Sequence, residues 1–129
     1  MKHPERVEDY LEHIAEAIDR ATGYLQPLKD LEALQKNKQV QDAVVRNIEI
    51  IGEAANKIHN LAPDFINRHP ELPWARMRGM RNVVLHEYFF VDLKIVWTTV
   101  KDDLPRLKQQ IDGLLTERRG HEREQDPSR

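Results

Sequence analysis

Hydrophobic residues recur along the chain at alternating spacings of three and four, which is typical of helices that bury one face. The first stripe predicts a long helix over about residues 4–26 and consists of Val7, Leu11, Ile14, Ile18, Ala21 and Leu25. Residues 27–30 predict a break, and residues 31–35 a turn or a short helix. A second stripe ends at residues 62–64 and predicts another long helix, with Val40, Val44, Ile48, Ile51, Ala55 and Ile58 as its members.

Gly52 lies inside the second stripe, where glycine costs about 1 kcal/mol relative to alanine. Close approach by another helix is the expected reason for its presence. After this helix, prolines between residues 63 and 73 predict a connector that contains one helical turn at residues 64–67.

Two further patterns predict a third and a fourth long helix. The third begins at Trp74 and continues through Met77, Met80, Val84 and Leu85, and Asp92 is the expected N-cap of the next helix. Pro105 predicts a kink or local break in the fourth helix, after residues 102–103. The fourth stripe consists of Leu93, Val96, Trp97, Val100, Leu104, Leu107, Ile111 and Leu114. We therefore expect an all-α bundle of four long helices plus short helical segments.

The chain has 129 residues, of which 40% are hydrophobic, so it fits one domain with a single core. Residues 1–116 are expected to form this domain. Residues 117–129 contain no apolar residue and are predicted to be a frayed or disordered charged tail.

Composition narrows the class of protein. The chain has no cysteine, no apolar signal segment at its start and no run of about 18 apolar residues, so we expect a soluble, cytoplasmic protein without a membrane span. The net charge of −2 argues against a general nucleic-acid coat protein. Positive charge nevertheless gathers in residues 66–88, which hold four arginines (Arg68, Arg76, Arg78 and Arg81) against Glu71 and Glu87.

Residues 81–88 combine a guanidinium, an imidazole and a phenol within an otherwise apolar pattern. Arginine offers a planar fork suited to phosphate, and histidine can take and give a proton near neutral pH, so Arg81 and His86 are candidates for handling a phosphodiester. The alternative is an amphipathic helix whose exposed face carries these side chains. His86-Glu87 is followed by Phe90 instead of a second histidine, which removes the helical zinc-protease pattern, and we expect no metal and no cofactor.

The spacing of this pair has a consequence for assembly. Residues five apart on a helix differ by about 140° around its axis and by about 7.5 Å along it, so Arg81 and His86 cannot lie side by side. One chain supplies one well-placed histidine, whereas cleavage of RNA through its 2′-hydroxyl needs both a base and an acid. A two-fold dimer would bring two histidines and two arginines into one cleft. The motif therefore predicts a homodimer if it is catalytic.

The chain resembles the HepT toxin family of the HEPN superfamily over residues 5–115. The matching blocks are Arg81-Asn82-(three residues)-His86-Glu87-Tyr88, Ile50-Ile51-Gly52-Glu53-Ala54, Pro73-Trp74, Asp92-Leu93-(three residues)-Trp97 and Leu104-Pro105. The resemblance implies an all-α, HEPN-like homodimer that acts as a metal-independent endoribonuclease in a type II or type VII-like toxin–antitoxin system. It also implies a partner, an MNT-type nucleotidyltransferase antitoxin that transfers AMP from ATP to the motif tyrosine, here Tyr88.

The roles that follow are hypotheses. His86 would act as general base or acid, and Arg81 would bind the scissile phosphate. Asn82 would contact the phosphate or orient a histidine, and Tyr88 would stack on a base or donate a hydrogen bond. Glu53 would pair with Arg81, although solvated positions for Glu53 and Asn82 are equally open. The alternative function is a non-catalytic subunit that binds a nucleotide or a partner nucleotidyltransferase, and a third reading is a dimerisation bundle without a ligand.

Overall fold

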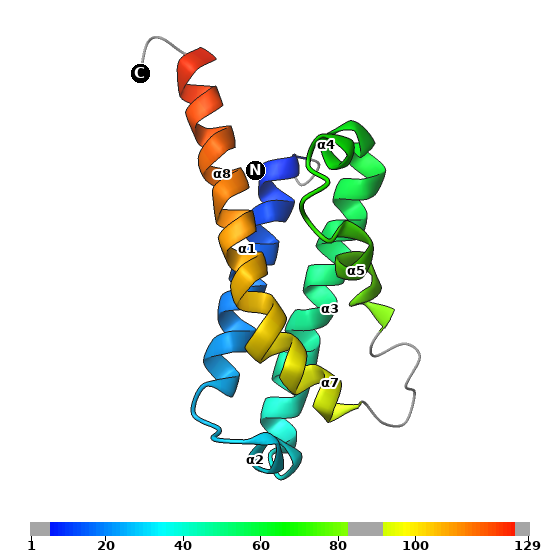
Figure 1. Cartoon of the computed structure of the whole chain (residues 1–129), viewed down its shortest axis with the longest axis vertical. Helices are drawn as coiled ribbons and strands as arrows, with labels where there is room; N and C mark the ends of the chain where they lie inside the picture. Colours follow the sequence, from blue (N-terminus) through cyan, green and yellow to red (C-terminus); the bar gives the residue numbers. More distant parts are fainter. Residues whose placement is uncertain (1–5, 83–91, 126–129) are drawn as a thin grey trace.

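The computed structural model describes residues 6–82 and 92–125 of the chain, and the side chains of residues 6–82 and 92–118 (Figure 1). Every regular element within these ranges is helical, which confirms the all-α prediction. Three long helices run along the long axis of the molecule (Figure 1). They are α1 (Val7–Leu25), α3 (Lys38–Leu61) and α8 (Leu104–Gln125), and α1 packs against both of the others.

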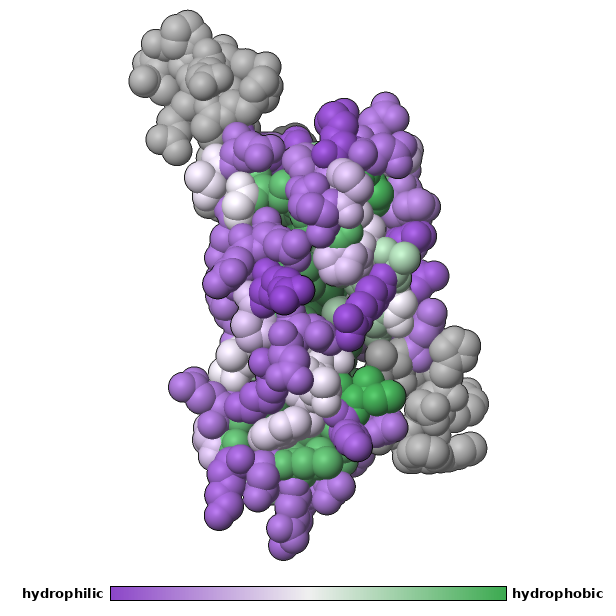
Figure 2. Space-filling model, viewed as in Figure 1, coloured by the Kyte–Doolittle hydropathy of each residue, from purple (hydrophilic) through white to green (hydrophobic). Residues whose placement is uncertain are grey.

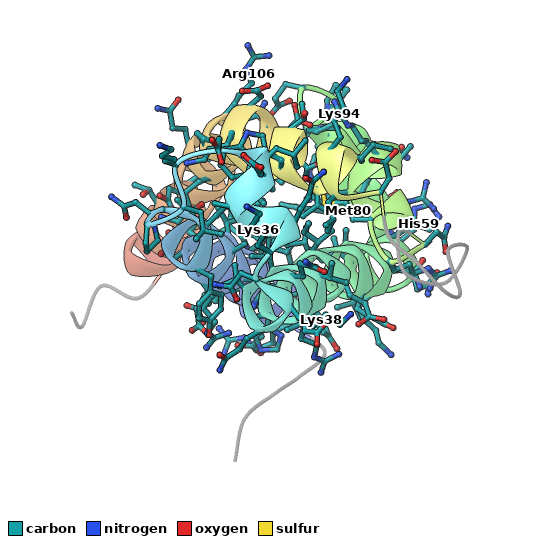
Figure 3. All side chains as sticks on the ribbon, turned by 90° about the horizontal axis from the view of Figure 1, so that it is seen from below. Lys36, Lys38, His59, Met80, Lys94 and Arg106 are labelled. Carbon is teal, nitrogen blue, oxygen red and sulfur yellow. The ribbon has the colours of Figure 1, made fainter. Side chains whose placement is uncertain are left out.

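The core lies along the predicted apolar stripes. All six members of the first stripe are buried in α1, and five of the six members of the second stripe are buried in α3, with Val40 half-buried. The described surface is largely hydrophilic on the face shown in Figure 2. Seen from one end of the bundle, Met80 lies among the helices while Lys94 and Arg106 point outward (Figure 3). No described helix is long and apolar enough to cross a membrane.

Short helices occupy the connections between the long ones. The predicted segment at residues 31–35 is helix α2 (Leu31–Gln35), which is capped by Asp30, whose side chain accepts a hydrogen bond from the backbone N–H of Ala33 at 2.9 Å. The helical turn expected at residues 64–67 is helix α4 (Pro63–Arg68), with proline in its first turn, where no N–H is needed. Both predictions are confirmed.

The fourth predicted helix is continuous but changes its winding. It consists of α7 (Leu93–Thr98), the π-helical segment η1 (Thr99–Asp103) and α8. Asp92 caps α7 as predicted, accepting hydrogen bonds from the backbone N–H groups of Lys94 at 3.0 Å and Ile95 at 3.3 Å. Pro105 does not break the helix here. The wider π turn just before the proline accommodates its ring and the missing N–H, so the helix continues with a local change of pitch.

The backbone of residues 117–125 differs from the expected frayed tail, because α8 continues as a helix to Gln125, and residues 126–129 lie outside the described residues. Residues 117–125 are mostly Glu, Arg and Gln, which form helices well without burying apolar surface. Arg118 also holds the helix to the bundle. Its Nε lies 3.2 Å from Oε2 of Glu8 on α1, and its guanidinium carbon lies 5.2 Å from the ring centroid of Phe65 on α4.

Candidate active site

The short helix α5 (Trp74–Gly79) precedes the motif at residues 81–88 and packs against α3. Trp74, Met77 and Met80 are buried, and the indole Nε1 of Trp74 donates a hydrogen bond to the backbone carbonyl of His69 at 2.8 Å. Trp74, with which the third predicted apolar pattern begins, is therefore a core residue. These anchors fix the position of the chain immediately before Arg81.

The third long helix expected from Trp74 onward ends at Gly79 instead. Met80 and Arg81 form a turn before the chain becomes helical again at Asn82. Trp74, Met77 and Met80, the members of this pattern that the structure describes, are buried as expected. Glycine is a weak helix former, and the turn lies where the chain passes Gly52 of α3. The backbone of Arg81 is therefore presented at a turn and not within a regular helix.

Gly52 of α3 lies in close contact with Arg81 of this turn. A Cβ built on Gly52 would lie 2.3 Å from the backbone nitrogen of Arg81 and 2.9 Å from the Cβ of Arg81. Such distances are far inside van der Waals contact, so only glycine fits at this position. The predicted close approach at Gly52 is confirmed, but the approaching segment is the turn at Arg81 and not the helix that was expected.

The other described candidates take different positions. Arg81 and Asn82 are both half-buried, so each retains partial access to solvent. Glu53 is exposed, and the expected pair between Glu53 and Arg81 is not among the ion pairs and hydrogen bonds of the described residues. The reason is helical geometry. Consecutive residues point about 100° apart, so when Gly52 faces Arg81 its neighbour is turned toward solvent.

His86 and Tyr88 lie outside the described residues, within the range 83–91. Their roles, and the gathering of His86 and Arg81 from two chains in one cleft of a dimer, therefore stay predictions. Within residues 6–82 and 92–125, no group of three or more His, Asp or Glu side chains is placed to hold a metal ion.

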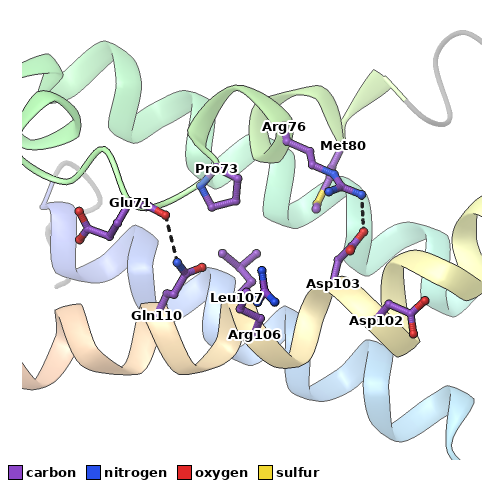
Figure 4. A pocket seen from close by; sticks show the side chains of 9 residues that line it. All are labelled: Glu71, Pro73, Arg76, Met80, Asp102, Asp103, Arg106, Leu107 and Gln110. Carbon is purple, nitrogen blue, oxygen red and sulfur yellow. Dashed lines mark hydrogen bonds and ion pairs between the residues drawn. The ribbon is translucent and has the colours of Figure 1, made fainter.

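A cleft of about 420 Å³ lies on the other side of α5, between this helix and the junction of η1 with α8 (Figure 4). Arg76 forms an ion pair with Asp103 across the cleft, and Nε2 of Gln110 donates a hydrogen bond to the backbone carbonyl of Glu71 at 3.1 Å. Its lining includes two arginines, Arg76 and Arg106, and three carboxylates, Glu71, Asp102 and Asp103. Because negative side chains outnumber positive ones, this cleft is a poor site for a polyanion.

The sequence did not predict the ion pair between Arg76 and Asp103, which links α5 to η1. The two residues are 27 positions apart, and both are charged residues of a kind usually found in solvent. A pattern of single residues does not reveal such a pair. The nearby Pro105 was the available signal that the helix geometry changes at Asp103.

The chain is similar to a known protein family and to several known proteins. A family model described as "Ribonuclease HepT-like" matches residues 14–114, a range that contains Gly52 and the whole of residues 81–88. The chain is 44% identical over 106 residues to a protein of Thermococcus cleftensis named "Probable ribonuclease HepT", covering 82% of this chain and 93% of that protein.

Two further relatives carry the name "Putative RNase". One, from Caldanaerobacter subterraneus subsp. tengcongensis, is 36% identical over 110 residues, covering 82% of this chain and 91% of that protein. Another, from Methanocaldococcus jannaschii, is 36% identical over 97 residues, covering 74% of this chain and 86% of that protein. No solved structure matches the chain.

Proposed function

Because the chain belongs to the HepT-like ribonuclease family, we propose that it is an endoribonuclease whose chemistry is carried by Arg81 and His86. The observation that supports this proposal best is the close contact of the Arg81 backbone with Gly52 of α3. Active-site groups need a rigid support to hold their geometry. Here the backbone of a half-buried arginine lies directly on a buried glycine of a long helix.

The proposed reaction uses the RNA's own 2′-hydroxyl as nucleophile. The 2′-oxygen forms a bond to the adjacent phosphorus while the bond from phosphorus to the 5′-oxygen breaks, which leaves a 2′,3′-cyclic phosphate and a 5′-hydroxyl. A base removes the proton of the 2′-hydroxyl, and an acid supplies a proton to the departing 5′-oxygen. His86 would fill one or both of these roles.

Arg81 would bind the scissile phosphate. A guanidinium can donate two parallel hydrogen bonds to phosphate oxygens, and it stabilises the additional negative charge that develops as the 2′-oxygen attacks. Asn82, the next residue, is half-buried and would add a hydrogen bond to the phosphate or orient a histidine. A site built from these groups needs no metal ion, because histidine handles the protons and arginine the charge.

We further propose that the working unit is a homodimer. One chain offers a single histidine in this motif, whereas the reaction requires a base and an acid. Two copies related by a two-fold axis would contribute two histidines and two arginines to one cleft.

The proposed regulator is an MNT-type nucleotidyltransferase antitoxin that modifies Tyr88. In this step the phenolic oxygen attacks the α-phosphorus of ATP, pyrophosphate leaves, and the hydroxyl proton is released. The attached AMP would place bulk and negative charge where the RNA phosphate must bind, so like-charge repulsion gives a physical reason for inactivation. The chain would then be the toxin of a toxin–antitoxin pair.

The nuclease proposal is tested by incubating purified protein with total RNA in EDTA and separating the fragments on a gel. We expect discrete cleavage by the wild type and a loss of at least about 100-fold in His86→Ala and Arg81→Ala, the range that single acid–base and charge-stabilising groups supply. His13→Ala and Arg106→Ala are matched controls, because both residues are exposed on other helices. Both controls should cleave at the wild-type rate.

The outcomes separate the hypotheses. Cleavage that persists unchanged in His86→Ala would exclude the proposed catalytic role of this histidine. Cleavage that disappears in EDTA and returns with a divalent cation would exclude the metal-independent mechanism. RNA that stays intact with every protein would favour the non-catalytic subunit that binds a nucleotide or a partner.

Modification of Tyr88 has a separate test. The protein is incubated with an MNT-type nucleotidyltransferase and ATP, and its mass and nuclease activity are measured together. We expect the wild type and Tyr24→Phe, a control at an exposed tyrosine of α1, to gain AMP and lose activity. Tyr88→Phe should gain no AMP and should continue to cleave RNA, and full inactivation of this variant would contradict the proposal.

A further inference from the structure

Gly52 differs from the other glycines whose surroundings the structure describes. A Cβ built on Gly23, Gly79 or Gly113 would meet no atom within 4 Å, whereas one built on Gly52 would meet the backbone nitrogen, the Cα and the Cβ of Arg81 at 2.3, 3.0 and 2.9 Å. Gly52 is also buried, inside a helix of 24 residues. Glycine there costs about 1 kcal/mol relative to alanine, so the contact with Arg81 is retained at the expense of helix stability.

The atoms that approach Gly52 cannot move aside by rotating a side chain. They are backbone atoms of Arg81 and the Cβ fixed to that backbone. The segment before them is held by Met77 and Met80, which are 0% and 6% exposed. Any side chain at position 52 must therefore push the Arg81 turn away from α3, because close-packed interiors do not absorb an extra methyl group without a shift.

We propose that Gly52 is a positioning residue that sets the place of the Arg81 guanidinium relative to the scissile phosphate of RNA. This inference rests on the proposed ribonuclease function. Gly52 touches the backbone of Arg81 and acts only through it. A displacement of about 1 Å in a catalytic group can lower a rate about 100-fold, so the absence of one Cβ on α3 determines whether Arg81 is aligned.

The test compares Gly52→Ala with two matched variants, Gly23→Ala in α1 and Gly113→Ala in α8. All three add one methyl group to a helical glycine, but only position 52 has atoms in the way. We expect Gly52→Ala to lower kcat by about 10- to 100-fold with a smaller change in KM, while both controls keep the wild-type kcat. Equal kcat in all three variants would overturn the role of Gly52.

A purely structural effect of Gly52 is separated by a double-mutant cycle. If Gly52 acts through Arg81, adding Gly52→Ala to Arg81→Ala should cause no further loss of kcat. A further loss by the same factor as in the wild-type background would show that Gly52 acts elsewhere and would overturn the proposal.

The same variants are also tested for folding. Circular dichroism and urea unfolding establish the folded fraction of each variant, and kcat is expressed per folded protein. If Gly52→Ala alone is unfolded, the triple variant with Gly23→Ala and Gly113→Ala is used, because alanine at an open helical position adds stability. Different results would overturn the ribonuclease function and the positioning role of Gly52. A wild type that cleaves no RNA overturns the ribonuclease function, whereas an active wild type with an equally active Gly52→Ala overturns the positioning role alone.

Discussion

Asn47 is the one polar residue that is buried among the described residues. It is 5% exposed on α3, and its Nδ2 donates a hydrogen bond to the backbone carbonyl of Ala43 at 2.8 Å. Its Oδ1 is buried without a hydrogen-bond partner among those residues. A buried acceptor left in this state costs about 1–3 kcal/mol, so Asn47 lowers the stability of the core that it occupies.

Replacing Asn47 with leucine should therefore raise the free energy of unfolding by about 1 kcal/mol, since the substitution removes the unsatisfied oxygen and adds apolar surface to a buried position. Urea unfolding measures the change. Asn60→Leu, at an exposed position of the same helix, is the matched control and should stay within about 0.5 kcal/mol of the wild type. A less stable Asn47→Leu would mean that the site cannot accommodate the branched side chain.

At the scale of single residues, the sequence predicted one contact of the site and not another. The presence of Gly52 was explained in advance by its cost in a helix, because only close packing justifies that cost. The proposed pairing of Glu53 with Arg81 had no such support. A sequence gives the face of a helix on which a residue lies, but the residue opposite depends on how α3 and the Arg81 turn are docked.

At the scale of elements, Asp92 is the clearest single determinant of where a helix begins. Its side chain accepts two hydrogen bonds from the first turn of α7. Asp92→Ala should lower stability by about 1 kcal/mol and Tm by about 4 °C, whereas Asp92→Ser should retain most of both because serine also caps helices. Thermal unfolding followed by circular dichroism checks the prediction, and an equal loss in both variants would contradict a capping role.

Helix positions were predictable from periodicity, but helix continuity was not. Trp74, Met77 and Met80 are buried as their spacing predicted, yet α5 ends at Gly79. At Pro105 the opposite happened, and the helix continued through a π turn. Periodicity reports which side chains face the core. Whether the backbone hydrogen bonds continue depends on local packing, such as the contact of Arg81 with Gly52.

At the scale of the whole molecule, Glu8 joins the beginning of α1 to the last turns of α8. Its carboxylate lies 3.2 Å from Nε of Arg118 and 3.5 Å from Nε of Arg6. Burial of the carboxyl acts to raise its pKa, but a backbone hydrogen bond and the two arginines outweigh this effect, and the pKa of Glu8 is lowered from 4.5.

A lowered pKa in the folded state means that Glu8 stabilises the fold above the pKa it has in the unfolded chain, near 4.5, and that this contribution is lost as the pH falls through the folded value. Urea midpoints measured from about pH 6 to about pH 3 should therefore fall less steeply in Glu8→Gln than in the wild type. Glu117→Gln, at an exposed position of α8, should retain the wild-type dependence. Parallel curves for the wild type and Glu8→Gln would show that this link does not contribute.

The proposed dimeric site makes a prediction that no single chain can satisfy. If two copies share one cleft and its two histidines serve as base and acid, a mixed dimer of one wild-type and one His86→Ala subunit lacks one of these groups. Equimolar mixing under conditions that allow subunit exchange should make about half of the dimers mixed and leave about a quarter as wild-type dimers. The mixture should then cleave RNA at about a quarter of the rate of the same total concentration of wild type. A rate of about half, equal to the mean of the two proteins measured separately, would place Arg81 and His86 in sites that each belong to one chain.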